Sequence, residues 1–311
     1  MRGLPARVTI VEVGPRDGLQ NEAQPVSTAL KIALVDRLAA AGLREIEATS
    51  FVSPRWVPQM ADAAQVMAGI TRSSAVRYSV LVPNLRGLDG AIAAGVDEVV
   101  IFGAASESFS QRNINCSIAE SVERFRPVAR AAKAAQLRLR GSVSCALGCP
   151  FEGAVSPQAV HEIVNRMADL GCDVIDIADT IGVATPRQVV AGFEAAARVV
   201  ALERLSGHFH DTYGQAVANV LTALHCGVTI FHSSIAGLGG CPYAPGATGN
   251  VATEDLLYLF DGLGIQTGVD TAAAVAVGQW ISAQLGRRAA SHAGNALAAR
   301  QARAANLAPT P

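Results

Sequence analysis

One short pattern recurs four times along the chain and restricts its fold more than any other feature. In each copy an alanine- and leucine-rich segment is followed by a glycine, two or three further residues and a run rich in β-branched residues. The copies are AAAGLREIEATS, AAGVDEVVIFGA, ADLGCDVIDIADT and LHCGVTIFHSSIA, with Gly42, Gly95, Gly171 and Gly227 as their glycines. Glycine often follows the last turn of a helix because it adopts left-handed backbone conformations without steric cost. Each copy therefore predicts a helix, a short loop and a buried strand.

The expected starts of three helices are marked as well. Ser156-Pro157 and Thr185-Pro186 each combine a capping side chain with a proline in the first helical position. Ser27 can cap the helix that leads to Gly42 in the same way.

Eight strand-like runs alternate with helical segments along nearly the whole chain. They cover residues 8–13, 45–49, 77–82, 98–102, 138–144, 174–178, 207–210 and 229–234. Strict alternation with apolar strands predicts a parallel sheet covered by helices. Eight units in about 270 residues predict an α/β fold of the closed (β/α)₈ TIM-barrel type. An open doubly wound sheet is the alternative, but the turn after the first strand reads GPRDG and not GxGxxG.

The division of the chain follows from these units. We expect a TIM-barrel catalytic domain over residues 1–280. Residues 281–311, which include the Ala/Arg-rich segment RRAASHAGNALAARQARAAN, are expected to form a C-terminal helical extension and tail. This extension is expected outside the barrel or at a contact between subunits.

Charge and cysteine usage exclude several classes of protein. Twenty-five basic and 26 acidic residues give a formal net charge of −1, and neither sign is clustered, so no nucleic-acid or membrane surface is expected. No apolar run reaches membrane-spanning length. The start MRGLPARVTI leaves no room for a signal peptide, and six scattered cysteines indicate reduced thiols. A cytoplasmic location is expected.

Two histidines, His208 and His210, stand at the end of the seventh expected strand. Alternating strand positions point both side chains to the same face. In an arbitrary strand such a pair is more often incidental, but barrel enzymes bind their ligands at the carboxyl ends of the strands. Asp17, after the first strand, can add a carboxylate. Imidazole and carboxylate ligands suit a divalent ion such as Mg²⁺ or Mn²⁺.

Two further charged residues belong to the same end of the expected barrel. Arg16 adjoins Asp17 in the turn GPRDG, and it is either a salt-bridged surface residue or a group that stabilises a developing oxyanion. Glu47 lies within an apolar strand, where it either orients Arg16 or a metal ligand or forms a purely structural ion pair.

The loop after the eighth strand, GLGGCPYAPGATGN, is rich in glycine and contains a single cysteine, Cys241. A phosphate cradle is one interpretation, because barrels often bind phosphate in this region. A mobile loop that closes over the substrate and delivers a thiol is the other. A thiol with a pKa of about 8.5 is protonated at neutral pH and can donate a proton to a carbanion.

Six segments together resemble the hydroxymethylglutaryl-CoA lyase family of metal-dependent TIM barrels. They are VEVGPRDGLQNE, IEATSFVSP, SCALGCPFEG, DIADTIGVATP, HFHDTYGQAVAN and AGLGGCPYAPGATGNVATED, and the likeness runs from about residue 8 to residue 262. The resemblance implies a divalent-metal-dependent cleavage of 3-hydroxy-3-methylglutaryl-CoA to acetoacetate and acetyl-CoA, as in leucine degradation. An acyl-CoA is then the expected small-molecule partner.

The resemblance also implies roles for individual residues. Metal ligands fall on Asp17, His208, His210 and Asn250. Arg16, Asp17, His208, Cys241 and Glu47 are the expected catalytic residues, and Arg16 and Asn113 are expected to contact substrate. Glu12, Asp179 and Glu254 are expected to support the site from behind. The base that removes the hydroxyl proton stays open between Asp17, His208 and a water on the metal.

Phe209, between the two histidines, and His232, before the serines of the eighth strand, depart from the residues usual in this family. A lyase for a longer 3-substituted substrate such as isohexenylglutaryl-CoA remains an alternative. So does a Claisen-condensing acyltransferase of the same superfamily. A homo-oligomer is expected, with a dimer as the commonest arrangement.

Overall fold

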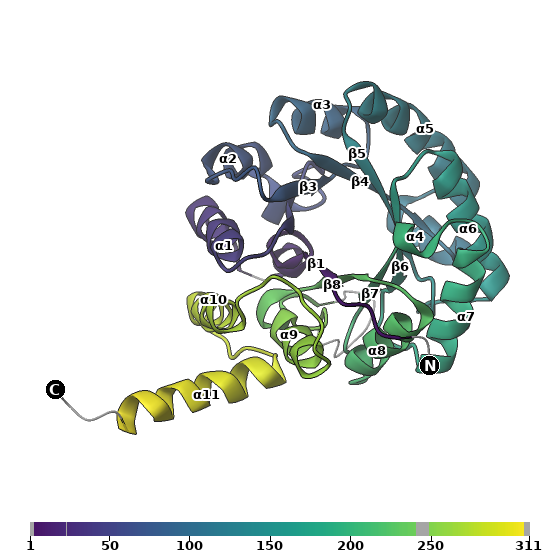
Figure 1. Cartoon of the computed structure of the whole chain (residues 1–311). Helices are drawn as coiled ribbons and strands as arrows, with labels where there is room; N and C mark the ends of the chain where they lie inside the picture. Colours follow the sequence, from purple (N-terminus) through teal and green to yellow (C-terminus); the bar gives the residue numbers. More distant parts are fainter. Residues whose placement is uncertain (1–2, 23, 241–248, 308–311) are drawn as a thin grey trace.

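The protein folds into a closed barrel of eight parallel strands surrounded by helices (Figure 1). The computed structural model describes residues 3–22, 24–240 and 249–307. The strands are β1 (Thr9–Glu12), β2 (Glu45–Ser50), β3 (Arg77–Leu81), β4 (Glu98–Ala104), β5 (Arg138–Ser144), β6 (Val174–Asp179), β7 (Leu205–Phe209) and β8 (Ile230–Ser233). Each strand pairs with the next, and β8 closes the barrel by pairing with β1. The predicted (β/α)₈ barrel is confirmed.

Helices alternate with the strands and form the outer ring of Figure 1. They are α1 (Thr28–Ala40), α2 (Ala63–Gly69), α3 (Leu85–Ala93), α4 (Glu107–Ile114), α5 (Ile118–Ala134), α6 (Pro157–Asp169), α7 (Pro186–Ala197), α8 (Ala216–Cys226), α9 (Thr253–Gly262), α10 (Thr271–Gln284) and α11 (His292–Leu307). The short helix α4 is an insertion between β4 and α5, and it lies beside the barrel mouth.

The capping serines and the glycines that end helices act as expected, whereas the Thr185 hydroxyl donates to Gln188 Oε1 at 2.9 Å. The Ser27 and Ser156 hydroxyls accept hydrogen bonds from the backbone of the first helical turn, at 3.3 and 3.1 Å. Gly42, which follows α1, and Gly227, which follows α8, both have a φ of 101°. A residue with a Cβ would be strained there, so glycine ends each helix and directs the chain into the next strand.

The seventh strand begins two residues earlier than the pattern indicates. Leu205 and Ser206 pair with Ile175 and Asp176 of β6, although the predicted strand begins at Gly207. His210 lies just beyond the strand and forms an isolated bridge with Asn250.

The apolar core lies mainly between the barrel and its helices, whereas the barrel interior is polar. Tyr78, Phe193, Phe209, Phe231 and Phe260 are among the largest fully buried side chains. The burial of Phe209 follows from strand alternation, which directs it away from the side on which His208 and His210 lie.

The C-terminal helices pack outside the barrel, as expected. Asp255 of α9 accepts hydrogen bonds from Ser291 Oγ at 2.8 Å and from Ala293 N at 2.6 Å, which fixes the start of α11. The later part of α11 projects away from the barrel (Figure 1). Helix α10 runs from Thr271 to Gln284, so the domain division at residue 280 stays a prediction.

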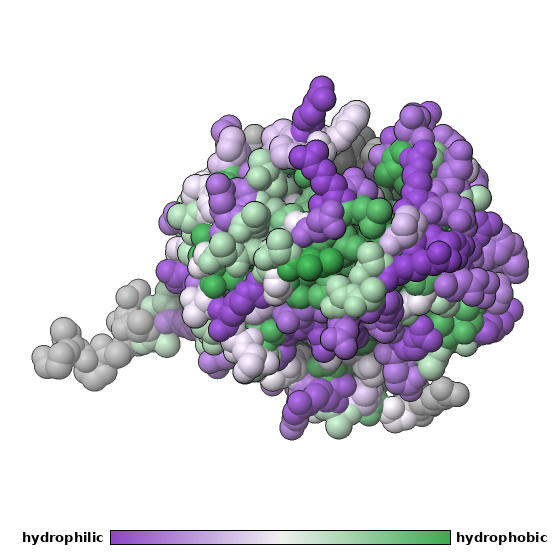
Figure 2. Space-filling model, turned by 90° about the horizontal axis from the view of Figure 1, so that it is seen from above, coloured by the Kyte–Doolittle hydropathy of each residue, from purple (hydrophilic) through white to green (hydrophobic). Residues whose placement is uncertain are grey.

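Seen from the α3 side, most of the surface is hydrophilic, with hydrophobic residues gathered near the middle of the view (Figure 2). Within the described residues, no helix is both long and apolar enough to cross a membrane.

Candidate active site at the carboxyl ends of the barrel strands

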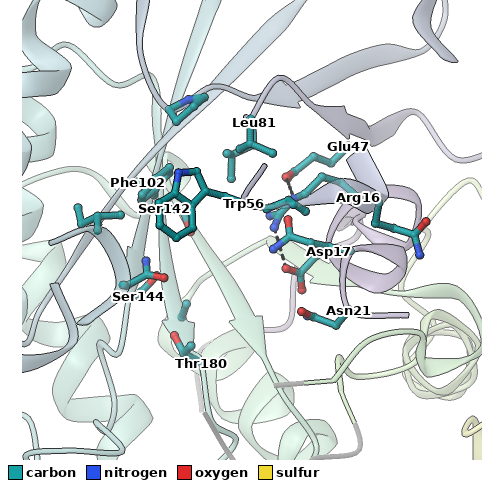
Figure 3. A pocket seen from close by; sticks show the side chains of 18 of the residues that line it. Arg16, Asp17, Asn21, Glu47, Trp56, Leu81, Phe102, Ser142, Ser144 and Thr180 are labelled. Atoms are coloured by element: carbon teal, nitrogen blue, oxygen red, sulfur yellow. Dashed lines mark hydrogen bonds and ion pairs between the residues drawn. The ribbon is translucent and has the colours of Figure 1, made fainter. Parts of the chain in front are cut away.

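A cavity of about 1290 Å³ opens at the carboxyl ends of the strands. Its lining includes five residues predicted for the site: Arg16, Asp17, Glu47, His208 and His210. Asn113, from α4, lies on the wall of the same cavity. Figure 3 shows Arg16 between Glu47 and Asp17, with Trp56, Leu81 and Phe102 facing them across the cavity.

Asp17, His208 and His210 form a group that can hold a metal ion. One ligand atom from each residue lies within 4.8 Å of the ligand atoms of the other two. The two imidazole rings have centroids 5.2 Å apart. Asn250 joins this group, because its Nδ2 donates to Asp17 Oδ2 at 2.8 Å.

The distances within this group fit a divalent cation. His210 Nε2 lies 3.8 Å from Asp17 Oδ2, which is too long for a hydrogen bond. Two ligand atoms at about 2.1 Å from one ion are separated by roughly 3 to 4 Å. His210 Nδ1 is buried and has no hydrogen-bond partner in the described parts of the chain. Carboxylate oxygen with imidazole nitrogen is a ligand set that Mg²⁺ or Mn²⁺ can use.

The electrostatic environment keeps two of these groups in the form that binds metal. Burial alone would raise the pKa of Asp17, but the charge of Arg16, with His210 and His208, holds this pKa well below its usual range. Burial and the neighbouring His210 lower the pKa of His208 to about 3. The carboxyl is therefore ionised and the imidazole neutral at neutral pH, and metal ligation requires both.

Arg16 and Asp17 are presented by a π-helical turn, Gly14–Gly18, that directly follows β1. Arg16 Nη1 donates to Asp17 Oδ1 at 2.7 Å, and Arg16 Nε pairs with Glu47 of β2. The turn packs tightly against the segment after β8, since a Cβ on Gly18 would lie 2.7 Å from Leu238 Cβ. Small residues in GPRDG thus allow the turn to approach β8, while two carboxylates fix the guanidinium.

Glu12 and Glu254 lie behind the cavity and bind the backbone of the turn that follows β8. Glu12 accepts hydrogen bonds from Gly14 N at 2.9 Å and Ile235 N at 2.8 Å. Glu254 accepts from Ala236 N at 3.1 and 3.0 Å. Burial raises the pKa of Glu12 to about 7 and that of Glu254 to about 8.

Asp179, at the end of β6, does not line the cavity either. Its two oxygens accept from Val183 N and Ala184 N, both at 3.0 Å. Burial raises its pKa to about 6, against the opposing effect of these hydrogen bonds. Asp179 therefore shapes the loop between β6 and α7. Of the remaining predicted site residues, Cys241 lies outside the described residues.

The structure adds a buried polar group that the sequence interpretation missed. Arg140, His232 and Asp176 are each at most 3% exposed and lie in the barrel interior beneath the histidines. Two arginines in the expected fifth strand, Arg138 and Arg140, were a signal for this group. The contact between Arg140 and His232 depends on the closed barrel, which brings β5 and β8 within side-chain reach of each other.

Comparisons with known proteins show the family of the chain. The HMGL-like family profile matches residues 7–281. Hydroxymethylglutaryl-CoA lyase of Pseudomonas mevalonii is 58% identical over 296 residues, which are 95% of this chain and 98% of that protein. A Pseudomonas aeruginosa protein, named 3-hydroxy-3-isohexenylglutaryl-CoA/hydroxy-methylglutaryl-CoA lyase, is 57% identical over 96% of this chain and 99% of its own length.

Solved structures show the same likeness. The crystal structure of hydroxymethylglutaryl-CoA lyase from Pseudomonas aeruginosa superposes with a TM-score of 0.94 at 56% identity. The superposition covers 96% of this chain and 99% of that chain. Hydroxymethylglutaryl-CoA lyases are similar to this chain over nearly its whole length. Since the family profile also matches residues 7–281, the chain belongs to the HMGL-like family.

Proposed function

We propose that this chain is a divalent-metal-dependent carbon–carbon lyase that cleaves 3-hydroxy-3-methylglutaryl-CoA to acetoacetate and acetyl-CoA. One observation carries the proposal: Asp17, His208 and His210 converge beside Arg16 in a single cavity at the carboxyl end of the barrel. Relatives at 55–58% identity are named hydroxymethylglutaryl-CoA lyases, which supports the same substrate class.

Asp17, His208, His210 and Asn250 would hold Mg²⁺ or Mn²⁺. When bound, the ion supplies Lewis-acid chemistry that makes the tertiary hydroxyl of the substrate more acidic. Asp17 and His208, both deprotonated at neutral pH, and a water on the metal stay the candidates for accepting the hydroxyl proton.

Arg16 is positioned to stabilise the negative charge that the bond cleavage creates. Breaking the bond between C2 and C3 of the substrate moves an electron pair onto the thioester and forms an enolate. A guanidinium held in place before the reaction stabilises this oxyanion without reorganising. Glu47 and Asp17 fix Arg16 on two sides, so its position does not depend on bound substrate.

The enolate carbon then takes a proton, and we assign the donor as Cys241. Gly240, the last described residue before Cys241, lines the cavity, which supports this assignment. A thiol with an ordinary pKa is protonated at neutral pH and is a suitable acid for this step.

The size and lining of the cavity suit an acyl-CoA. Arg112 and Arg124 add positive charge to the wall on which Asn113 lies. Trp56 is 86% exposed although it lines the cavity, so a ligand in the cavity can cover it. We assign the nucleotide-bearing part of CoA to this cationic side and the glutaryl end to the metal side.

A substrate with a longer 3-substituent is the second candidate, because the Pseudomonas aeruginosa relative is named for isohexenylglutaryl-CoA as well. Assaying both CoA thioesters side by side, with Mn²⁺ and with a chelator, tests the proposal. Metal-dependent release of acetyl-CoA from the 3-methyl substrate supports the first candidate. Turnover of the longer substrate alone assigns the second, and turnover of neither contradicts the proposed function.

A further inference from the structure

The floor of the active-site cavity contains a buried ion-pair network that the proposed reaction does not use. His232 borders this cavity and also a smaller cavity of about 250 Å³ at the opposite end of the barrel. Arg140 lines the smaller cavity and is 2% exposed, while His232 is 3% exposed. Buried charges are costly unless they are paired, so their arrangement calls for a physical account.

The ring of His232 is fixed by polar contacts on one nitrogen. Arg140 Nη1 lies 2.9 Å from His232 Nε2, and a guanidinium can only donate. A neutral His232 ring with its proton on Nδ1 accepts this hydrogen bond through Nε2. Asp176 Oδ1 lies 3.3 Å from the same nitrogen and accepts a hydrogen bond from the Ser206 hydroxyl.

The His232 ring also packs against the ring of His208. His208 and His232 are register partners on β7 and β8, so their side chains share one side of the sheet. Their ring centroids are 5.5 Å apart and their planes meet at 88°, an edge-to-face contact. This packing restrains the ring of His208, whose other ring neighbour is His210.

Arg140 extends the contacts towards the other half of the site. Its Nη2 donates to Glu47 Oε2 at 2.7 Å and to Ser79 Oγ at 3.1 Å. The other oxygen of Glu47 is paired with Arg16. A continuous series of contacts thus runs from His208 through His232, Arg140 and Glu47 to Arg16.

We propose that His232 is a positioning residue with two separable effects. Its ring orients His208 in the metal site, and its Nε2, through Arg140 and Glu47, holds Arg16 in place. The inference rests on the proposed function for the roles of His208 and Arg16. The contacts themselves do not depend on which CoA thioester is the substrate.

Two substitutions separate the effects. His232→Phe keeps a ring against His208 but removes the acceptor for Arg140. It should leave the Mn²⁺ affinity of the metal-free protein, measured by titration calorimetry, within about threefold of the parent, and lower kcat at saturating Mn²⁺ by about tenfold or more. His232→Gln keeps an acceptor oxygen but removes the ring. It should weaken Mn²⁺ binding by about 10-fold or more, while kcat at saturating Mn²⁺ falls less than in His232→Phe.

His161 provides matched controls. It lies on α6, is partly buried outside the cavity, and its Nδ1 lies 3.4 Å from Ala195 O. His161→Phe and His161→Gln should change neither Mn²⁺ affinity nor kcat. If both His232 variants lower affinity and kcat in the same proportion, or change neither, the proposal is overturned.

A crystal structure of the parent protein with Mn²⁺ provides a test that needs no variant to fold. The expected result is His232 Nε2 bonded to Arg140 and its ring packed on His208. A ring turned away from His208, or Nε2 bonded to Asp176 instead of Arg140, would overturn the proposal. Failure of the proposed function gives a different result. If the parent protein binds Mn²⁺ and the two His232 variants differ in Mn²⁺ affinity as expected, but the parent cleaves neither thioester, only the proposed function is contradicted.

Discussion

Asp17 Oδ2 and His210 Nε2 face each other at 3.8 Å across the mouth of the barrel, although the two residues come from the first and seventh strand ends. The separation is too long for a hydrogen bond and suits two ligands of one ion. The candidate metal site therefore depends on barrel closure, which brings β1, β7 and β8 together.

Replacing Asp17 should remove metal binding. Asp17→Asn eliminates the charge that attracts the cation. Loss of a residue that only supports a metal ligand lowers metal affinity by about 10- to 100-fold, and we expect a larger loss of Mn²⁺ affinity here. Titration calorimetry of the metal-free protein measures this. Asp89→Asn, on the exposed face of α3, is the control and should bind Mn²⁺ like the parent. Parent-like binding by Asp17→Asn would exclude Asp17 as a ligand.

Replacing Arg16 should affect the chemical step and spare the metal site. Arg16→Gln removes the charge proposed to stabilise the enolate oxygen, and kcat should fall by at least about 100-fold. Mn²⁺ affinity should stay close to that of the parent protein. Arg72→Gln, at an exposed position, is the matched control. A kcat within a few-fold of the parent for Arg16→Gln would show that its role is structural.

The thiol of Cys241 should be needed for turnover but not for metal binding. Cys241→Ser keeps the size of the side chain and replaces the thiol by a far weaker acid, so kcat should fall. Cys226→Ser, on α8, should behave like the parent protein. Unchanged kcat in Cys241→Ser would remove this thiol from the proton transfer.

The closely packed position of Gly18 should not accommodate a methyl group without destabilising the fold. A Cβ there would lie 2.7 Å from Leu238 Cβ and 2.9 Å from Ser234 Oγ. Gly18→Ala should lower the free energy of unfolding by about 1–3 kcal/mol and reduce kcat, because the GPRDG turn must shift away from β8. Gly262→Ala has no atom within 4 Å of the added carbon and is the control. Urea unfolding compares the two, and equal stabilities would contradict the packing argument.

The buried carboxyls behind the site should make stability depend on pH. Burial raises the pKa of Glu254 from 4.5 to about 8, so the folded state binds a proton that the unfolded state releases. The resulting stabilisation is present in full at acidic pH and is lost as pH rises from about 4.5 through about 8. Melting temperatures of Glu254→Gln should decline less across this range than those of the parent. Glu162→Gln, on exposed α6, should keep the parent slope, and identical slopes in all three proteins would contradict a protonated Glu254.

The fold was predictable because its determinants are local. Glycines after helices, such as Gly42, and capping serines, such as Ser27, act within a few residues. His208 and Asp17 were identifiable because strand ends of a barrel share one rim. The link from His232 through Arg140 to Glu47 was not predictable, since it depends on side-chain directions across three separate strands. Glu12 and Glu254 were expected behind the site, but their contacts with backbone amides of the turn after β8 were not predictable.

The most direct test of the account is acetyl-CoA release from 3-hydroxy-3-methylglutaryl-CoA by the purified full chain. We expect steady release with Mg²⁺ or Mn²⁺, complete loss after chelation, and recovery when the metal is restored. Release that persists undiminished in the presence of chelator, or no release with either metal, would contradict the claim that Asp17, His208 and His210 form the metal centre of a lyase.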